Sequence, residues 1–268
     1  MPKLTLPDVT LHYEIDGSGP PLLMIAGMVS DSASWAPLVP LLSPHFTLIR
    51  PDNRTTGRTA PVDAAVSVEI YAEDCAALLD RLNIPQAHVI GHSMGGMIAL
   101  ELLHAYPDQL ASLTLAATAP VRLTRNQALF KALLAIRQSD AAPDTWLHAF
   151  FPWLFAPAVY DIPGAVDAAA AASLTYAHAQ TVGGMAHQLG ALEGYQPRTL
   201  ASPLPAPTQA LLAQDDMLIP LPMAQQALAG IPTHIIPDAG HSIHWDAPQA
   251  VADHVKSFAN SNPITGAP

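Results

Sequence analysis

Gly91-His92-Ser93-Met94-Gly95 is the stretch of this sequence that decides the fold. It places a serine between two glycines, directly after the apolar run of residues 87–90 and directly before the helical run of residues 97–103. A nucleophilic serine needs a sharp turn from strand to helix, which holds its side chain out at the end of a sheet. Glycines flank such a turn because the backbone packs too closely there for side chains. The stretch predicts covalent catalysis by the Ser93 hydroxyl, although a glycine-rich turn opening an ordinary helix gives the same pattern.

The composition indicates one large globular domain, or a domain with an insertion. The chain has 268 residues, of which 50% are hydrophobic and 12% are charged, and its formal net charge is −11. Its Lys and Arg residues form no basic cluster, which disfavours a nucleic-acid partner. No apolar stretch is long enough to cross a membrane, and the start lacks a charged leader followed by an apolar block. We therefore expect a cytoplasmic protein.

No pattern in the sequence predicts a metal or another cofactor. His241 and His244 lack the glutamate of a helical H-E-x-x-H zinc site, and neither a G-x-G-x-x-G motif nor a P-loop is present. The chain has one cysteine, Cys75, which cannot form an intrachain disulfide. We expect it to be a buried and inert thiol.

Short apolar runs alternate with helical segments over the first 120 residues. The runs at 22–26, 46–50, 87–90 and 113–116 are typical of strands covered on both faces, and helices are expected over 34–42, 68–82 and up to 106. Residues 9–15 alternate in polarity, which predicts a half-exposed strand at the sheet edge with His12 and Glu14 on its polar face. The alternation predicts the α/β class, with a doubly wound, mostly parallel sheet.

The alternation stops between about residue 120 and residue 202, where alanine-rich segments and an aromatic cluster at 146–155 indicate helices. We predict a helical lid, or cap, over residues 121–200, inserted into a core formed by residues 1–120 and 201–268. Strand-like runs resume at 208–213 and 233–236, and a final helix is expected over 248–258. The tail from residue 260 is expected to fray.

Two further loops supply the base and the orienting acid that a serine nucleophile needs. Asp215 and Asp216 follow the run at 208–213, and His241 follows the run at 233–236. Parallel strands present such loops at one edge of the sheet, beside Ser93. The order Ser, Asp, His is that of doubly wound hydrolases, but spacing alone does not choose between the two aspartates.

These motifs resemble those of the α/β-hydrolase superfamily over nearly the whole chain. The matching segments are the serine turn at 91–96, the acid loop at 216–220, the histidine loop at 240–248 and the loop at 52–57. The resemblance implies Asp216 as the acid and His241 as the base, with His244 lining the site. The sequence departs from the family at Ala26, where histidine is common, and at Thr55, where glycine is common.

The resemblance also implies an oxyanion hole, in which two backbone N–H groups stabilise the charge that develops on the substrate oxygen. One donor is Met94, which follows the nucleophile, and the other is Met28, in the loop after residues 22–26. The aromatic residues Trp146, Phe150 and Trp153, together with His244, are candidates for the wall of an apolar substrate pocket. Clusters of this kind also serve only to dock a lid on its core.

We therefore predict a serine hydrolase that cleaves a small-molecule carboxylic ester or lactone through an acyl-enzyme intermediate. Other families that this sequence resembles use the same triad for different reactions. These families are the carbon–carbon bond hydrolases, the aminoacrylate-type enamine hydrolases and the cofactor-free haloperoxidases or perhydrolases. A ligand-binding member without turnover is a further alternative. The mostly apolar lid favours small or medium uncharged esters, and the basic residues Arg122, Arg125 and Lys131 are the place to look for an acidic substrate. The sequence identifies neither the physiological substrate nor the oligomeric state.

Overall fold

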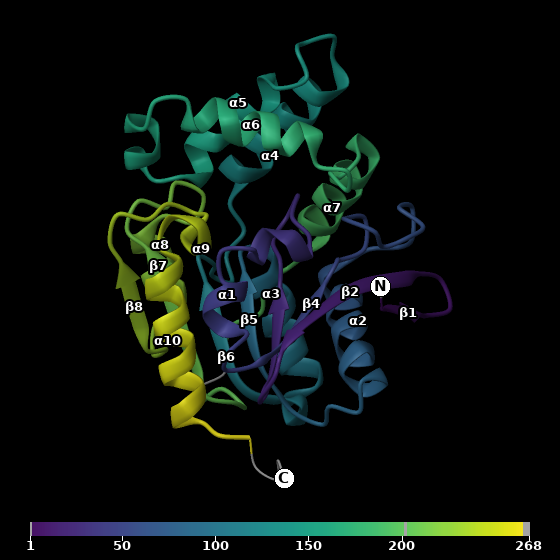
Figure 1. Ribbon diagram of the computed structural model, residues 1–268, viewed down its shortest axis with the longest axis vertical. Helices are drawn as coiled ribbons and strands as arrows, with labels where there is room; N and C mark the ends of the chain where they lie inside the picture. Colours follow the sequence, from purple (N-terminus) through teal and green to yellow (C-terminus); the bar gives the residue numbers. More distant parts are fainter. Residues whose placement is uncertain (1, 201–202, 265–268) are drawn as a thin grey trace.

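The computed structural model describes residues 2–200 and 203–264. Within these ranges an eight-stranded sheet runs through the molecule in the order β1-β2-β4-β3-β5-β6-β7-β8 (Figure 1). Strand β2 pairs in antiparallel fashion with β1 and β4, and all other neighbours pair in parallel. The strands are β1 (Lys3–Thr5), β2 (Thr10–Gly17), β3 (Pro21–Ile25), β4 (Thr47–Pro51), β5 (Ala87–His92), β6 (Leu110–Ala116), β7 (Thr208–Ala213) and β8 (Thr233–Ile236). The predicted α/β class with a mostly parallel sheet is confirmed.

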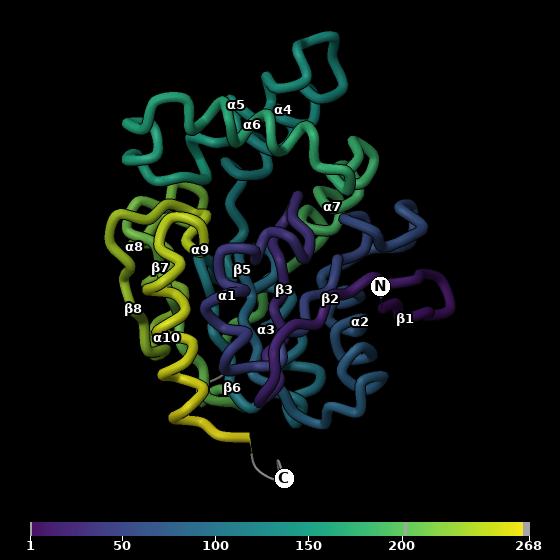
Figure 2. The backbone as a smooth tube through the Cα atoms, viewed as in Figure 1, coloured from purple at the N-terminus to yellow at the C-terminus, as the bar shows by residue number. Residues whose placement is uncertain are grey.

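Helices cover both faces of the sheet, as the backbone tube in Figure 2 shows. One face carries α2 (Val68–Arg81), α3 (Met94–Ala105) and α8 (Leu221–Ala227), and the other carries α1 (Val39–Leu42) and α10 (Pro248–Ser261). Side chains alternate along each strand, so Leu22 and Met24 pack with α1 and α10, whereas Leu23 and Ile25 pack toward α2 and α3. Burial on both sides explains why these strands read as continuous apolar runs.

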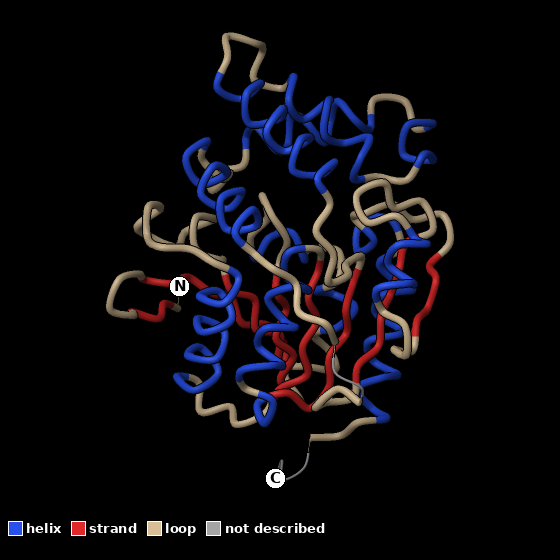
Figure 3. Tube along the Cα trace, turned by 180° about the vertical axis from the view of Figure 1, so that it is seen from behind, coloured by secondary structure: helices blue, strands red, loops and turns tan. Residues whose placement is uncertain are grey.

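Most of the remaining helices lie between β6 and β7 in the chain. We call the helices α4 (Thr124–Gln138), α5 (Thr145–Leu154), η3 (Pro157–Asp161), α6 (Ala165–Thr175) and α7 (Val182–Gly194) the insertion. Helices α4, α5 and α6 lie beyond one end of the strands, and Figure 3 shows the same arrangement from behind. Leu147, Phe151 and Ala170 give the insertion a small apolar cluster of its own. Short helices elsewhere are η1 (Ser32–Trp35), η2 (Pro107–Gln109) and α9 (Ile243–Asp246).

The prediction for the strand at residues 9–15 is wrong in two respects. This strand is not at the sheet edge, because Lys3–Thr5 pairs outside it as β1. His12, expected on a half-exposed face, is only 1% exposed. The Thr59 hydroxyl oxygen accepts the His12 N–H at 3.0 Å, and His12 Nε2 lies 3.0 Å from Glu14 Oε1. The His12 imidazole is thus buried with Glu14 of the same strand as its partner, while the loop residue Thr59 binds the His12 backbone.

The carboxyl-terminal helix is longer than predicted. It continues to Ser261, so residues 260 and 261 are helical rather than frayed. The last four residues of the expected tail, 265–268, and residues 201–202 of the expected lid boundary lie outside the described ranges.

Cys75 lies on α2 and is 2% exposed, which agrees with the expected buried thiol. Burial raises the pKa of the Cys75 thiol, so the reactive thiolate is disfavoured. In the part of the chain that the structure describes, no helix combines the length and the apolar character needed to cross a membrane.

Candidate active site

Ser93 lies at the sharp turn between β5 and α3, with φ 55° and ψ −121°. A Cβ on Gly91 would lie 2.3 Å from the Gly95 carbonyl oxygen, and a Cβ on Gly95 would lie 2.0 Å from the Ile25 oxygen. Both positions therefore require glycine. The Ser93 N–H donates to the Ala116 carbonyl at 3.1 Å, so the adjacent strand holds the turn in its uncommon conformation.

The structure brings the three sequence-predicted residues Ser93, His241 and Asp216 together. Ser93 Oγ lies 2.8 Å from His241 Nε2, and His241 Nδ1 lies 2.9 Å from the nearer Asp216 carboxylate oxygen. The N–H groups of Leu218 and Ile219 each donate to Asp216 Oδ1 at 2.8 Å. These donors orient the carboxylate toward His241. It is thus Asp216, and not its neighbour Asp215, that contacts the imidazole.

Two more histidines surround His241, and both are held in the neutral form. His92 Nε2 lies 2.8 Å from the His241 carbonyl oxygen, so this nitrogen carries hydrogen and donates. Burial lowers the pKa of His92 well below its usual range, and His244 and His241 beside it act in the same direction. Burial also lowers the pKa of His244 to about 3, and its ring lies against Trp35 at 4.9 Å between centroids. His241 is the imidazole that contacts the Ser93 hydroxyl, while His92 fixes its backbone.

The predicted oxyanion donors Met28 and Met94 lie beside Ser93 and have free N–H groups. Among the described residues, neither N–H has a hydrogen-bond acceptor within the protein. A Cβ on Gly27 would lie 3.0 Å from Ser93 Cβ, which shows how closely the loop after β3 approaches the nucleophile. Asn53 Nδ2 donates to the Ala26 carbonyl at 3.0 Å and so anchors the start of this loop.

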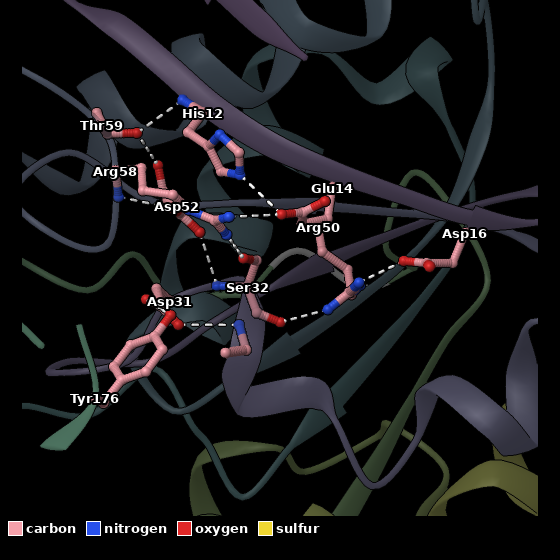
Figure 4. A network of polar contacts seen from close by, with 11 residues as sticks. His12, Glu14, Asp16, Asp31, Ser32, Arg50, Asp52, Arg58, Thr59 and Tyr176 are labelled. Atoms are coloured by element: carbon pink, nitrogen blue, oxygen red, sulfur yellow. Dashed lines mark hydrogen bonds and ion pairs between the residues drawn. The ribbon is translucent and has the colours of Figure 1, made fainter. Parts of the chain in front are cut away.

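A buried polar network supports the same loop, as Figure 4 shows. Asp52 is fully buried, and its two carboxylate oxygens accept the N–H groups of Ser32 at 3.0 Å and Arg58 at 2.8 Å. The Arg58 guanidinium lies 2.8 Å from Glu14 on β2. The network therefore ties the segment after β3 to the loop after β4 and to the sheet.

One contact connects this region to the insertion. The Tyr176 hydroxyl, just after α6, donates to Asp31 Oδ2 at 2.7 Å, and Asp31 Oδ1 accepts the Ala33 N–H at 2.9 Å. Burial raises the pKa of the Asp31 carboxyl, and Asp52 nearby acts in the same direction. Burial together with Asp31 also raises the pKa of the Tyr176 hydroxyl, so tyrosine remains the donor in this contact.

A cavity of about 590 Å³ lies between Ser93 and the insertion. The predicted pocket residues Trp146, Phe150 and His244 line it. Trp153 does not, because its ring lies 5.4 Å from the Arg125 guanidinium instead. Much of the wall is apolar: it includes Phe130, Leu147, Phe151, Leu154, Phe155 and Val166. No group of side chains in the described ranges is arranged to hold a metal ion.

Sequence reasoning missed three residues of this region: His92, Gln188 and Arg137. His92 had a usable signal, since it lies between Gly91 and the nucleophile. Gln188 accepts the Val29 N–H at 3.0 Å across 159 residues of chain, which no local pattern indicates. Arg137 lines the cavity, whereas the basic residues singled out from the sequence were Arg122, Arg125 and Lys131.

Comparison with known proteins agrees with the fold. The sequence model of the α/β hydrolase fold matches residues 20–248, and the chain belongs to this family. A Variovorax paradoxus protein named "Putative carbamate hydrolase RutD" is 30% identical over 239 residues, covering 87% of this chain and 89% of the relative. The family and such relatives define the chain as a hydrolase.

Solved structures give the same result for the fold. The "Putative non-heme bromoperoxidase BpoC" of Mycobacterium tuberculosis is 27% identical with a TM-score of 0.83, covering 95% of this chain and 97% of that one. The enol-lactonase of Burkholderia xenovorans is 22% identical with a TM-score of 0.81, covering 97% and 100%. At such low identity, the second likeness concerns the fold alone.

Proposed function

We propose that this chain is a serine hydrolase that cleaves small carboxylic esters or lactones, with Ser93, His241 and Asp216 as its catalytic residues. The observation that carries the proposal is the continuous contact from Ser93 Oγ to His241 Nε2 at 2.8 Å and from His241 Nδ1 to Asp216 at 2.9 Å. Nucleophile, base and orienting acid in hydrogen-bond contact are the requirement of acyl transfer by serine.

Acylation follows from the donor and acceptor roles in this chain. Asp216 accepts the Nδ1 hydrogen of His241, which leaves Nε2 free to take the Ser93 proton. Ser93 Oγ attacks the substrate carbonyl carbon, and the N–H groups of Met28 and Met94 donate to the oxyanion that forms. The intermediate collapses, the carbon–oxygen bond to the alcohol breaks, and His241 gives its proton to the leaving oxygen.

Deacylation repeats these steps with water. A water molecule gives a proton to His241 Nε2 and attacks the acyl carbon of the Ser93 ester. The bond to Ser93 Oγ then breaks, the proton returns to that oxygen, and the carboxylic acid leaves. For a lactone, the alcohol and the acid are two ends of one product.

We further propose that residues 121–200 act as a lid on a core of residues 1–120 and 201–268. The support is the cavity itself, whose floor includes Ser93 and His241 and whose upper wall comes from the insertion. Trp146 and Phe150 provide apolar surface for the acyl or alcohol part of the substrate.

Carbamate hydrolysis is a second candidate, favoured by the 30% identical relative whose name refers to it. The same contacts support it, because Ser93 would attack a carbamate carbonyl as it attacks an ester carbonyl. Comparing turnover of aryl acetates, lactones and aryl carbamates by the same preparation separates the two candidates.

The decisive test is Ser93→Ala, assayed with an aryl acetate and with a fluorophosphonate probe. We expect kcat to fall by about 10⁴-fold or more, and the probe to label Ser93 in the wild-type protein only. Full activity of the variant would contradict the proposed mechanism. Absence of labelling in folded wild-type protein would instead favour a ligand-binding protein without turnover.

A further inference from the structure

Arg137 is the one lysine or arginine among the residues that line the 590 Å³ cavity. It lies in the last turn of α4 and is half-buried. Its guanidinium lies 4.4 Å from the centre of the Trp146 ring, one Nη donates to the Gln180 carbonyl at 2.7 Å, and the other contacts Met185 Sδ at 3.4 Å. The side chain is therefore held in one orientation by neutral groups.

No carboxylate compensates this positive charge. Within residues 2–200 and 203–264, no Asp or Glu oxygen lies within ion-pair distance of Arg137. Burial lowers the pKa of Arg137, and no acidic neighbour acts in the opposite direction. Two of its five N–H donors have partners in the protein, which leaves three for a ligand.

The carboxylates on the cavity wall already have their own donors. Asp31 accepts from Tyr176 and Ala33. Asp246 accepts the N–H groups of Ala156 at 3.0 Å and Gly240 at 2.8 Å. Neither carboxylate is placed to neutralise the guanidinium, so the cavity combines apolar walls with one uncompensated cation.

Of the three basic residues that the sequence suggested, one has a carboxylate partner and none lines the 590 Å³ cavity. Lys131 pairs with Glu193 at 2.7 Å, and Arg125 donates to the Met217 carbonyl and lies over Trp153. Arg122 borders a smaller cavity of about 70 Å³ but is itself exposed, where water and salt weaken its charge. The sequence pointed to these three, and the structure instead favours Arg137.

We infer that Arg137 binds a carboxylate of the substrate, so that the cavity selects acyl compounds that carry a second, ionised carboxyl group. This inference rests on the proposed acyl hydrolysis at Ser93. A planar guanidinium with free N–H donors matches a carboxylate, and a single cation matches a single negative charge. The apolar wall between the two ends accommodates the methylene chain that joins ester and carboxylate.

The test compares methyl half-esters of straight-chain dicarboxylic acids with neutral methyl esters of the same chain length. The measured quantity is the ratio of the two kcat/KM values in wild type, Arg137→Met and Arg137→Lys. We expect Arg137→Met to lower this ratio by about 10- to 100-fold, because a charge-assisted hydrogen bond is lost. Arg137→Lys retains the charge without the planar guanidinium, so its ratio should lie between those of wild type and Arg137→Met.

Arg125→Met is the matched control, since Arg125 also lies over a tryptophan of the insertion but is not on the cavity wall. It should keep the wild-type ratio within about twofold. An unchanged ratio in Arg137→Met, or an equal loss in Arg125→Met, would overturn the inference. Should Arg137→Met fail to fold, an unchanged ratio in Arg137→Lys would overturn it as well.

A binding measurement separates this inference from the proposed function. Calorimetry with Ser93→Ala and a half-ester measures recognition without turnover, and adding Arg137→Met should weaken that binding by about tenfold or more. Arg137-dependent binding without any wild-type turnover would support the carboxylate site and contradict the hydrolase mechanism. Ser93-dependent turnover of neutral esters without Arg137-dependent binding would support the hydrolase mechanism and contradict the carboxylate site.

Discussion

Gln188, on helix α7 of the insertion, accepts the backbone N–H of Val29 at 3.0 Å, one residue after the proposed oxyanion donor Met28. The same Gln188 oxygen accepts a hydrogen bond from Gln180 Nε2 at 2.8 Å, and Gln188 is fully buried. Val29 has φ 62°, a conformation that a β-branched residue rarely adopts. The insertion therefore helps to hold the loop whose N–H must point at the reacting oxygen.

Gln188→Leu should lower kcat more than it changes KM. The substitution leaves the N–H of Val29 without its acceptor, so the loop can leave its strained conformation. The Met28 N–H is then no longer oriented toward the oxyanion. We expect about a tenfold loss of kcat on an aryl acetate, with a loss of about 1–3 kcal/mol in the free energy of unfolding measured in urea.

Gln188→Glu is the control, because a carboxylate oxygen can still accept from both Val29 and Gln180. It should recover most of the kcat lost in Gln188→Leu. A rise in KM with kcat unchanged in the leucine variant would mean that Gln188 affects substrate binding and not the oxyanion loop.

Asp216→Asn should lower kcat by about 10³- to 10⁴-fold, since an amide at this position no longer holds the Nδ1–H tautomer of His241. Asp215→Asn is a matched control one residue away. The Asp215 backbone N–H donates to Ala239, but its side chain does not contact His241. Steady-state rates of both variants check this, and similar losses in the two would contradict the assignment of Asp216.

His88 on β5 should contribute to a loss of stability as the pH falls, in the same direction as the buried His92 and His244. His88 Nδ1 lies 2.8 Å from Ser112 Oγ, and burial lowers the pKa of His88 to about 4. The unfolded chain protonates this imidazole below about pH 6.5, while the folded protein keeps it neutral. The contribution of His88 to the free energy of unfolding is therefore complete above pH 6.5. It is lost as the pH falls, by at most about 1.4 kcal/mol per pH unit.

His88→Gln should flatten this dependence between about pH 6.5 and pH 4, as measured by urea unfolding. Buried carboxyls such as Asp31, whose pKa is raised, change stability in the opposite direction, so the comparison with wild type is what isolates His88. The same substitution at the exposed His104 should leave the wild-type dependence in place. Equal pH profiles for wild type and His88→Gln would rule out this origin.

Tyr176→Phe should loosen the contact between the insertion and the core. The variant loses the hydrogen bond to Asp31, worth about 1–2 kcal/mol, so amide hydrogens near residues 176–181 should exchange about tenfold faster. Tyr160 also belongs to the insertion, but its hydroxyl has no partner among the described residues. In Tyr160→Phe the same amide hydrogens should exchange at the wild-type rate. Equally faster exchange in both variants would contradict the role of the Asp31 contact.

Much of the fold and the positions around Ser93 could be predicted because they follow from local spacing. A glycine-flanked serine after an apolar run, and an acid and a histidine each just past a strand, fix where these residues lie once the strands are parallel. Strand β1 was missed because three residues carry no usable periodicity. Spacing alone did not separate Asp215 from Asp216, since the direction of a side chain in a loop depends on backbone angles that spacing does not encode. The family resemblance implied Asp216, and it is Asp216 that contacts His241.

The insertion was the least predictable region, for a physical reason. Its alanine-rich helices are stabilised by a few aromatic contacts and by groups far away in the sequence, such as Val29 with Gln188. Arg137 and Lys131 look alike in the sequence of α4, yet only Lys131 has a carboxylate partner, on α7. Which cation remains unpaired is a property of the packed helices.

The burial of Cys75 has a practical consequence for spectroscopy. It is the chain's single cysteine, and at 2% exposure its thiol is shielded from alkylating reagents in the folded protein. The substitution Leu174→Cys, at a position that is 45% exposed on α6, would therefore give one fluorophore attachment point without replacing the native Cys75. Emission from that label would test whether α6 moves during turnover.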